Sequence, residues 1–215
     1  MHYEELKDRH RAERDDWPNN LSLRVHRSLS WLHRSELCDD ADGRFIFLWI
    51  SFNAAYAQEL NSFTRANERE RFEGFIAKLV DLDTTGRLHG LLWDTYSSTV
   101  RVLLDNKFVF QPFWDAQTDE AVAATWENDF DKAKAAANRA LGRNDTATVL
   151  GIVLSRLYTL RNQLMHGGAT WNSSVNRDQM RDCSSFLGEL VPVMLTVMMD
   201  NPGTLWGDAC YPVID

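Results

Sequence analysis

The sequence predicts an all-α helical bundle. Apolar residues recur at the helical spacing through most of the chain, as at Val25, Leu29 and Leu32, while alternation with a period of two is nearly absent. A chain of 215 residues that is 44% hydrophobic and 25% charged is long enough to bury the core of one soluble domain. We therefore expect helices throughout, without a β-sheet.

Three regions are expected along the chain. Residues 1–20 should form a long charged N-terminal arm or helix, residues 21–201 the helical bundle, and residues 202–215 a short C-terminal tail packed on the bundle. The tail carries Trp206 and Tyr211, and large aromatic side chains such as these should anchor it.

The helical segments of the first half differ in how much of their surface is apolar. Residues 4–16 are charged and have few apolar positions, which predicts a surface helix or a partly frayed arm. Residues 22–37 carry an apolar stripe with a polar back and end before an acidic break at residues 39–43. Residues 45–60 are apolar on most faces and should form the central buried helix, followed by another striped helix at residues 67–82.

The sequence of the second half of the chain predicts less regular structure, followed by two long helices. Residues 88–104 indicate a broken helix, and residues 106–114 an aromatic loop packed on the bundle. Thr118 should cap a long, partly exposed helix that ends near residue 141. After a turn, residues 146–166 and 176–200 predict the last two long helices. The side chains expected in the core are Phe47, Trp49 or its neighbour Leu48, Leu154, Leu157 and Leu187.

Charge and cysteine usage exclude several classes of protein. A net charge of -8 and a pI near 5.2 argue against a protein that coats nucleic acid through a general electrostatic field, but a nuclease can work with a local basic site. Three cysteines without close pairing, and a charged N-terminus without an apolar core, indicate a reducing, cytoplasmic location. The apolar runs are too short or too interrupted to span a bilayer, so we expect no membrane partner.

Metal and cofactor chemistry has no visible residue pattern. The histidines and cysteines lack the spacings of a zinc site. The chain has neither a Gly-rich phosphate-binding loop with a Lys nor a Gly-x-Ser-x-Gly nucleophile motif. We therefore expect no metal and no cofactor.

One segment carries more chemistry than the rest of the chain. Arg161, Asn162 and His166 lie near the end of the helix predicted at residues 146–166, directly before two glycines. A guanidinium can clamp a phosphate through two parallel hydrogen bonds, and an imidazole moves protons near neutral pH. An Arg and a His separated by four residues could therefore suffice to cleave a phosphodiester. Asn162 could hold the His or a phosphate oxygen, and an exposed Asn on the helix is the equally common alternative.

The same residues also fit a plain structural role. Arg161 would then pair with a surface carboxylate, and His166 would interact with the helix C-terminus, where positive charge is favoured. The two glycines are sufficiently explained as a helix C-cap.

On one ideal helix His166 lies about 140° around the axis from Arg161. A two-fold dimer that faces this helix against its copy would therefore assemble the pair more readily than a monomer.

Four further residues near the motif are candidates for substrate binding. Arg156 and Arg177 supply positive charge, and Trp171 with Asn172 could stack on a base and read it. A Trp in such a position is more commonly a packing anchor.

Residues 160–168 resemble the signature of the HEPN superfamily (higher eukaryotes and prokaryotes nucleotide-binding). That signature is an Arg, usually followed by a polar residue, and then a His a few positions later near the end of a late helix; here these are Arg161, Asn162 and His166. The apolar residues 45–56 are similar to the buried helix of HEPN domains found in abortive-infection proteins. The resemblance covers roughly residues 21–200.

The resemblance implies a helical bundle that dimerises through the motif helix and, in many members, cleaves RNA without a metal. In such members the ribose 2′-hydroxyl attacks the adjacent phosphate. Carried over by position, Arg161 would hold the phosphate, His166 would be the general acid or base, and Asn162 would assist. The implied setting is toxin–antitoxin or antiviral defence. RNA, a second copy of the chain and an antitoxin or regulatory protein are the implied partners.

Two other readings of the chain stay open at this point. The first is a non-catalytic helical module whose Arg161 and His166 bind a nucleotide or a protein partner. The second is a purely structural dimer. The acidic net charge of -8 favours these two readings, whereas the intact motif with its neighbouring arginines favours the ribonuclease.

Overall fold

The fold is helical throughout the part of the chain that the structure describes. The computed structural model describes residues 2–56, 65–174, 177–209 and 211. These residues form helices, turns and loops without a β-sheet. The expected all-α class is thereby confirmed.

The chain separates into two compact units. The terminal unit combines Met1–Leu88 with Ser174–Asp215, and the middle unit is His89–Ser173. We expected one bundle over residues 21–201, and both unit boundaries fall inside that range. The motif helix belongs to the contiguous middle unit, whereas the last long helix belongs to the terminal unit.

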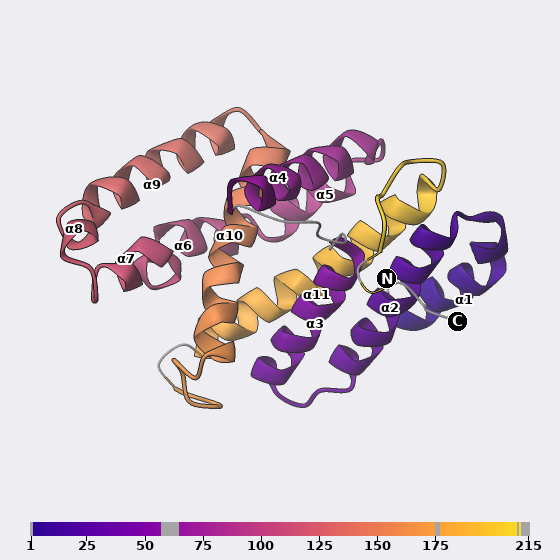
Figure 1. Cartoon of the computed structure of the whole chain (residues 1–215), viewed down its shortest axis with the longest axis horizontal. Coiled ribbons are helices and arrows are strands. Elements are labelled where there is room, and N and C mark those ends of the chain that lie inside the picture. Colours follow the sequence, from indigo (N-terminus) through magenta and orange to yellow (C-terminus); the bar gives the residue numbers. More distant parts are fainter. Residues whose placement is uncertain (1, 57–64, 175–176, 210, 212–215) are drawn as a thin grey trace. The chain divides into compact units, whose positions relative to one another are not determined.

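The terminal unit is built around one helix that is apolar on most sides. Its helices are α1 (Tyr3–Glu13), α2 (Asn19–Glu36), α3 (Ala41–Tyr56), α4 (Arg65–Leu82) and α11 (Arg177–Asp200). α3 packs against both α2 and α11 (Figure 1). Phe45, Leu48, Phe52 and Ala55 of α3 are all buried, and their spacing repeats at the helical period. The expectation of a central buried helix is therefore confirmed for this unit.

α3 begins earlier than expected because a carboxylate caps its first turn. Asp40 accepts a hydrogen bond from the backbone N–H of Gly43 at 2.8 Å, which is the N-cap arrangement. The acidic break expected over residues 39–43 is therefore shorter, and the helix starts at Ala41. The last part of the helix expected over residues 45–60 lies outside the described residues.

Most of the core side chains expected from the sequence are buried. The confirmed ones, each at most 5% exposed, are Leu48, Trp49, Leu154, Leu157 and Leu187. The prediction for Phe47 is wrong, because two positions along a helix turn a side chain about 200° away from Phe45. Phe47 is only partly buried; it stacks on Trp31 with 5.8 Å between ring centroids and lies 4.7 Å from the Arg34 guanidinium carbon.

The C-terminal tail has one aromatic anchor rather than two. Trp206 is buried, and its indole N–H donates to the carbonyl of Asn201 at 3.1 Å. Tyr211 is 86% exposed, so the prediction that its ring anchors the tail is wrong. The tail is held there through the backbone instead, since the carbonyl of Tyr211 accepts from Arg27 at 2.6 Å.

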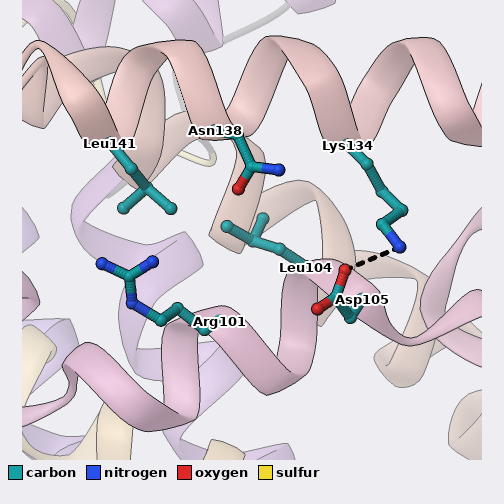
Figure 2. A pocket seen from close by; sticks show the side chains of 6 residues that line it. All are labelled: Arg101, Leu104, Asp105, Lys134, Asn138 and Leu141. Atoms are coloured by element: carbon teal, nitrogen blue, oxygen red, sulfur yellow. Dashed lines mark ion pairs between the residues drawn. The ribbon is translucent and has the colours of Figure 1, made fainter.

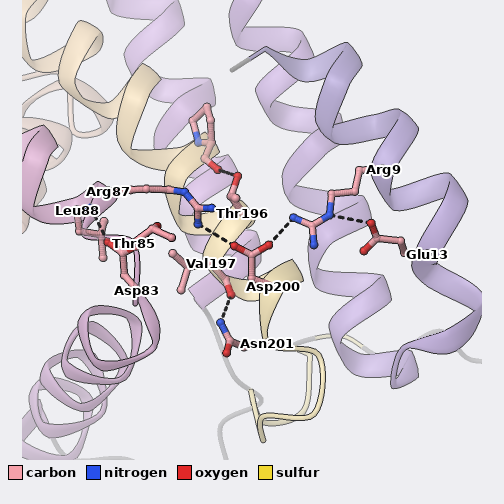
Figure 3. A network of polar contacts seen from close by, with 11 residues as sticks. Arg9, Glu13, Asp83, Thr85, Arg87, Leu88, Thr196, Val197, Asp200 and Asn201 are labelled. Atoms are coloured by element: carbon pink, nitrogen blue, oxygen red, sulfur yellow. Dashed lines mark hydrogen bonds and ion pairs between the residues drawn. The ribbon is translucent and has the colours of Figure 1, made fainter.

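A carboxylate at the end of α11 connects α1 to the rest of the terminal unit. Asp200 accepts from Arg9 of α1 at 2.7 Å and from Arg87 at 2.7 Å, and Arg9 also donates to Glu13 (Figure 3). Partial burial acts to raise the pKa of Asp200, but the hydrogen bonds from Arg87 and Arg9 outweigh it and hold that pKa below its usual range. α1 is thus a docked helix rather than a frayed arm, and its Leu6 is 1% exposed.

We expect Asp200→Asn to lower the free energy of unfolding by about 1 kcal/mol near neutral pH, because it removes the charge shared by both arginines. A carboxylate with a lowered folded-state pKa stabilises the fold above its unfolded pKa near 4, and this contribution disappears as the pH falls through the folded value. Urea unfolding of the two proteins should show a difference at neutral pH that shrinks below about pH 4. A difference independent of pH would contradict stabilisation by these ion pairs.

α11 packs against the central helix α3 and is itself largely buried in the terminal unit. Among the described residues, α11 is the helix whose length and composition would suffice to cross a membrane. However, 72% of its most apolar stretch is buried inside the protein. Phe186, Leu187 and Leu190 are among the side chains that it buries. A helix covered in this way is typical of a protein core.

The middle unit is built from shorter helices around one long helix. After α5 (Arg87–Gly90), which lies at the unit boundary, come a π-helical turn at Leu91–Thr95, α6 (Ser97–Asp105), a 3-10 turn at Lys107–Val109, α7 (Gln111–Asp115), α8 (Glu120–Ala123), α9 (Trp126–Gly142) and α10 (Thr146–Met165). α10 packs against α6 and α9. The break expected within residues 88–104 is confirmed by the π-helical turn before α6.

The long helix expected after Thr118 is split in two. Asp119 caps the first part, and its carboxylate accepts from the backbone N–H of Ala121 at 2.9 Å. The prediction of Thr118 as the cap is wrong, since a charged carboxylate one residue later interacts better with the positive end of a helix. α8 ends at Ala123, and α9 starts only at Trp126.

Candidate functional site

α10 buries one side and exposes the other. Asp145 caps its start by accepting from the backbone N–H of Thr148 at 3.0 Å. The opposite side of the helix exposes Tyr158 and Met165, which are 50% and 51% exposed. The buried side chains are Val149, Leu150, Val153, Leu154, Arg156, Leu157, Thr159 and Leu160. A ligand or a second protein can therefore reach the exposed side.

The end of α10 is fixed by two glycines, as the sequence predicts. The backbone N–H of Gly167 donates to the carbonyl of Leu164 at 3.2 Å, and that of Gly168 donates to the carbonyl of Gln163 at 2.7 Å. Together with a φ of 71° at Gly167, these hydrogen bonds form a Schellman cap. The C-cap interpretation is confirmed, and the cap fixes the backbone of His166, the residue directly before the left-handed turn.

We expect Gly167→Ala to destabilise the protein by about 1 kcal/mol, because an L side chain is strained in the left-handed backbone region. Gly74→Ala is the matched control, since Gly74 lies inside α4 and a Cβ there would meet nothing within 4 Å. That change should stabilise the protein by roughly 0.5–1 kcal/mol. Thermal unfolding measures both effects, and a shift of the same sign at both positions would contradict the role of the cap.

Arg161 bends toward Asn162 at the end of α10. Its guanidinium donates to the side-chain oxygen of Asn162 at 3.0 Å. Asn162 lies about 40° around the helix from His166, whereas Arg161 lies about 140° from it. The hydrogen bond therefore draws the guanidinium from its own face toward the face that carries His166. Arg161 and Asn162 are partly buried, and His166 is exposed one turn further along.

Arg156 is buried on a different side of α10. It is 4% exposed, and its guanidinium carbon lies 4.5 Å from the centre of the Phe110 ring and 5.6 Å from that of Phe130. Among the described residues its Nε has no hydrogen-bond partner, and burial lowers the pKa of Arg156 to about 10. Cation–π attraction to the two rings holds α10 against α9. We therefore infer that Arg156 has a packing role, and we leave it out of the candidate site although the sequence suggested a substrate contact.

The other three expected substrate contacts lie in two different units. Trp171 and Asn172 are exposed in the loop after the glycine cap, within the middle unit. Trp171 is 74% exposed, which does not fit a packing anchor. Arg177 belongs to the terminal unit, where it donates to Asp42 at 2.8 Å, and the Asp42 side chain is 5% exposed. This ion pair gives Arg177 a structural role at the start of α11.

The sequence matches no protein-family model. No curated protein and no solved structure matches it either. Within the described part of the chain, no group of three or more His, Cys, Asp or Glu side chains is placed to hold a metal ion.

The structure adds an aromatic surface beside the motif that the sequence alone did not connect to it. The side chain of Gln163, within the motif, donates to the carbonyl of Phe108 at 2.6 Å. The indole N–H of Trp114 donates to the same carbonyl at 2.8 Å. Phe108 is 45% exposed and Trp114 is 40% exposed. The run of aromatic residues was visible in the sequence, but no local signal indicated that it would lie against α10.

A small pocket lies between α6 and α9 of the middle unit (Figure 2). Its volume is about 90 Å³, and an ion pair of 2.9 Å joins Lys134 to Asp105 within its lining. The residues that line it are Arg101, Leu104, Asp105, Lys134, Asn138 and Leu141. Pockets for small-molecule ligands usually hold about 300 Å³ or more, so this one is too small for a nucleotide. The motif end of α10 is therefore the better candidate site.

Proposed function

We propose that the protein is a metal-independent endoribonuclease of the HEPN type that works as a homodimer. The contact between Arg161 and Asn162, one turn before the exposed His166, is the observation that supports this most directly. It sets a permanent cation beside an amide whose position lies about 40° around the helix from that of His166. Such a set can bind a phosphate and move a proton without a metal.

In the proposed reaction the ribose 2′-hydroxyl attacks the adjacent phosphorus, and the bond from phosphorus to the 5′-oxygen breaks. One His166 accepts the proton of the 2′-hydroxyl, or donates one to the leaving 5′-oxygen. Arg161 neutralises the negative charge that grows on the phosphate oxygens. Asn162 orients the guanidinium and offers amide N–H donors to the same oxygens. The products are a 2′,3′-cyclic phosphate and a 5′-hydroxyl.

The acidic net charge of -8 argues against coating RNA through a general electrostatic field, so the proposed enzyme would hold only a few nucleotides at a local site. We place the proposed activity in the cytoplasm, in toxin–antitoxin or antiviral defence, with an antitoxin or regulatory protein as a partner. The defence setting and the partner follow from the sequence resemblance, and the cytoplasmic location follows from the cysteine usage and the charged N-terminus.

A second copy of the chain would complete the proposed site. On a single helix the faces of Arg161 and His166 stay about 140° apart, and the reach of Arg161 toward Asn162 closes only part of that angle. Tyr158 and Met165 expose about half of their surface on α10, at 50% and 51%, and offer a face on which a second α10 can pack. A two-fold axis through this face brings two arginines and two histidines to one cleft.

We expect Tyr158→Glu to convert the dimer into a monomer, because a two-fold axis places the introduced carboxylates against each other. Trp31→Glu is the matched control, since Trp31 is an aromatic residue of the terminal unit that is 37% exposed. That change should leave the dimer intact. Sedimentation at micromolar concentration measures both masses. A monomeric wild type, or a Tyr158→Glu protein that stays dimeric, would contradict dimerisation through α10.

The proposed activity is tested by incubating the pure protein with total RNA in EDTA, beside His166→Ala prepared in the same way. Fragments with cyclic phosphate ends from the wild type, and none from the variant, support the proposal. The alternative function, a non-catalytic module that binds a nucleotide or a protein, gives no fragments from either protein. Equal cleavage by both proteins means a different site or a contaminant and overturns the proposal.

A further inference from the structure

Beside the motif lies a surface made of Lys107, Phe108 and Trp114, which we name the aromatic ledge. Phe108 and Trp114 expose 45% and 40% of their surface, and their ring centroids are 6.4 Å apart. The ammonium of Lys107 lies 5.4 Å from the centre of the Phe108 ring. Lys107 and Phe108 come from the 3-10 turn and Trp114 from α7, so the ledge forms only in the folded unit.

Two hydrogen bonds to one carbonyl fix the aromatic ledge against α10. The carbonyl of Phe108 accepts from Gln163 at 2.6 Å and from the indole of Trp114 at 2.8 Å. Gln163 lies about 60° around α10 from His166, on the side away from Arg161. Around the axis of α10, the position of His166 therefore falls between the position of Arg161 and that of Gln163, which contacts the aromatic ledge.

The exposed rings of the aromatic ledge are held in place by a third ring. Phe113 meets Phe108 and Trp114 edge to face, with centroids 5.4 Å and 5.2 Å apart. Phe113 in turn contacts Trp126 of α9 at 5.1 Å. Rings fixed in this way lose little freedom when a ligand stacks on them, which favours binding.

The charge of the aromatic ledge suits a phosphate. Within the described residues Lys107 makes no ion pair, and its ammonium contacts the faces of Phe108 and Phe113. The carboxylate of Asp115, next to Trp114 in the sequence, accepts from Gln111 at 2.9 Å. A positive charge beside exposed rings is the combination that proteins use to bind unpaired nucleotides.

We propose that the aromatic ledge binds bases of single-stranded RNA that flank the phosphate held at Arg161, an inference that rests on the proposed ribonuclease function. Every base has a flat face, so stacking on Phe108 and Trp114 tolerates different sequences, while Lys107 contacts a backbone phosphate. In a duplex the bases are stacked on one another and present no face to the aromatic ledge. The preferred substrate is therefore unpaired RNA, such as loops and single strands.

Binding is measured with labelled single-stranded RNA of about ten nucleotides, within the range of known single-strand sites. All proteins carry His166→Ala so that the RNA is not consumed. Phe108→Leu keeps an apolar side chain but removes the flat ring, and we expect binding to weaken about tenfold. Lys107→Gln keeps the length but removes the charge, and we expect the dependence of affinity on salt concentration to fall. A duplex of the same sequence should bind at least about tenfold more weakly than the single strand.

Two control variants carry the same chemical changes elsewhere. Trp31→Leu removes an exposed ring from the terminal unit, and Lys132→Gln removes an exposed charge from α9. Both should bind RNA like the parent. Weaker binding in the two ledge variants alone supports the proposal. Equal binding by all five proteins, or no binding by the parent, overturns it.

A second measurement covers the case in which a ledge variant fails to fold. RNA that contains 4-thiouridine is cross-linked by light to the His166→Ala protein, and the linked peptides are identified by mass spectrometry. Cross-links at Phe108 or Trp114 support the proposal, and cross-links confined to other segments overturn it.

The failure of this proposal and the failure of the proposed function give different results. If the wild type cleaves RNA and the ledge variants bind RNA as tightly as the parent, the binding role of the aromatic ledge is contradicted and the ribonuclease function is supported. If RNA binding depends on the aromatic ledge but the wild type cleaves no RNA, the ribonuclease function is contradicted and a surface that binds single strands is supported.

Discussion

Replacing His166 with alanine should slow RNA cleavage by roughly a hundredfold or more, which is the usual contribution of a positioned acid–base group. The imidazole is exposed at the end of α10 and lies outside the buried side of the helix, so the variant should fold like the wild type. The rate is measured under single-turnover conditions in EDTA, which should have little effect. An unchanged rate in a folded His166→Ala protein would remove His166 from the mechanism.

Arg161 should be at least as sensitive as His166. Arg161→Ala removes the charge that faces the phosphate, and loss of one such group usually lowers the rate about a hundredfold to a thousandfold. Arg161→Lys keeps the charge but loses the planar guanidinium that contacts Asn162 in the wild type. Its cleavage rate should therefore lie between those of the wild type and of Arg161→Ala. Arg143→Ala, at an exposed turn after α9, is the matched control and should cleave like the wild type. A rate for Arg161→Ala equal to that of the control would contradict the proposed phosphate contact.

Replacing Arg24 with alanine should produce the largest loss of stability among the changes considered. Arg24 is 0% exposed, and its guanidinium donates to the carbonyl of Ala55 at 2.7 Å and to that of Asp208 at 2.6 Å. Hydrogen bonds to a charged group each contribute about 1.5–3 kcal/mol, and the substitution also leaves a cavity and two carbonyls without their donor. We expect the free energy of unfolding to fall by about 3 kcal/mol or more.

Arg27→Ala is the matched control for Arg24. Arg27 stands one turn later on α2 and also donates to a carbonyl of the tail, at 2.6 Å from the oxygen of Tyr211, but this contact is exposed. Its loss should change stability by no more than about 0.5 kcal/mol. Urea unfolding of the two variants gives the comparison. A similar effect at both positions would mean that burial does not strengthen the hydrogen bonds of Arg24.

Helix type and approximate position followed from the sequence because burial imposes a helical period on apolar residues. α10 and α11 were therefore predicted within one residue of their observed bounds, whereas α3 begins four residues earlier than expected. The exceptions have local causes: Asp40 and Asp119 cap helices at positions that apolar spacing does not mark. The two compact units were not visible, since no Pro- or Gly-rich linker separates them and their boundaries depend on contacts between distant parts of the chain.

The motif end of α10 could be predicted as a site because three reactive residues and the glycine cap lie within one short segment. The neighbourhood of that segment could not. Arg156 and Arg161 lie on different faces of one helix: Arg156 packs on aromatic rings, and Arg161 donates to Asn162. A count of the charged residues along the sequence does not distinguish the two. The aromatic ledge depends on a hydrogen bond between Gln163 and Phe108, which are far apart in sequence. Only the fold brings them together.

The discontinuous composition of the terminal unit has a consequence for the order in which the chain folds during synthesis. Its helices α1, α2 and α3 leave the ribosome first, but α11, which packs against all three, is made only after the entire middle unit. The middle unit is contiguous and can complete its own packing earlier, because closing a short stretch of chain loses less entropy than closing a long one. The apolar faces of α3 and its neighbours therefore stay uncovered on the α11 side until synthesis of the middle unit and of α11 is complete.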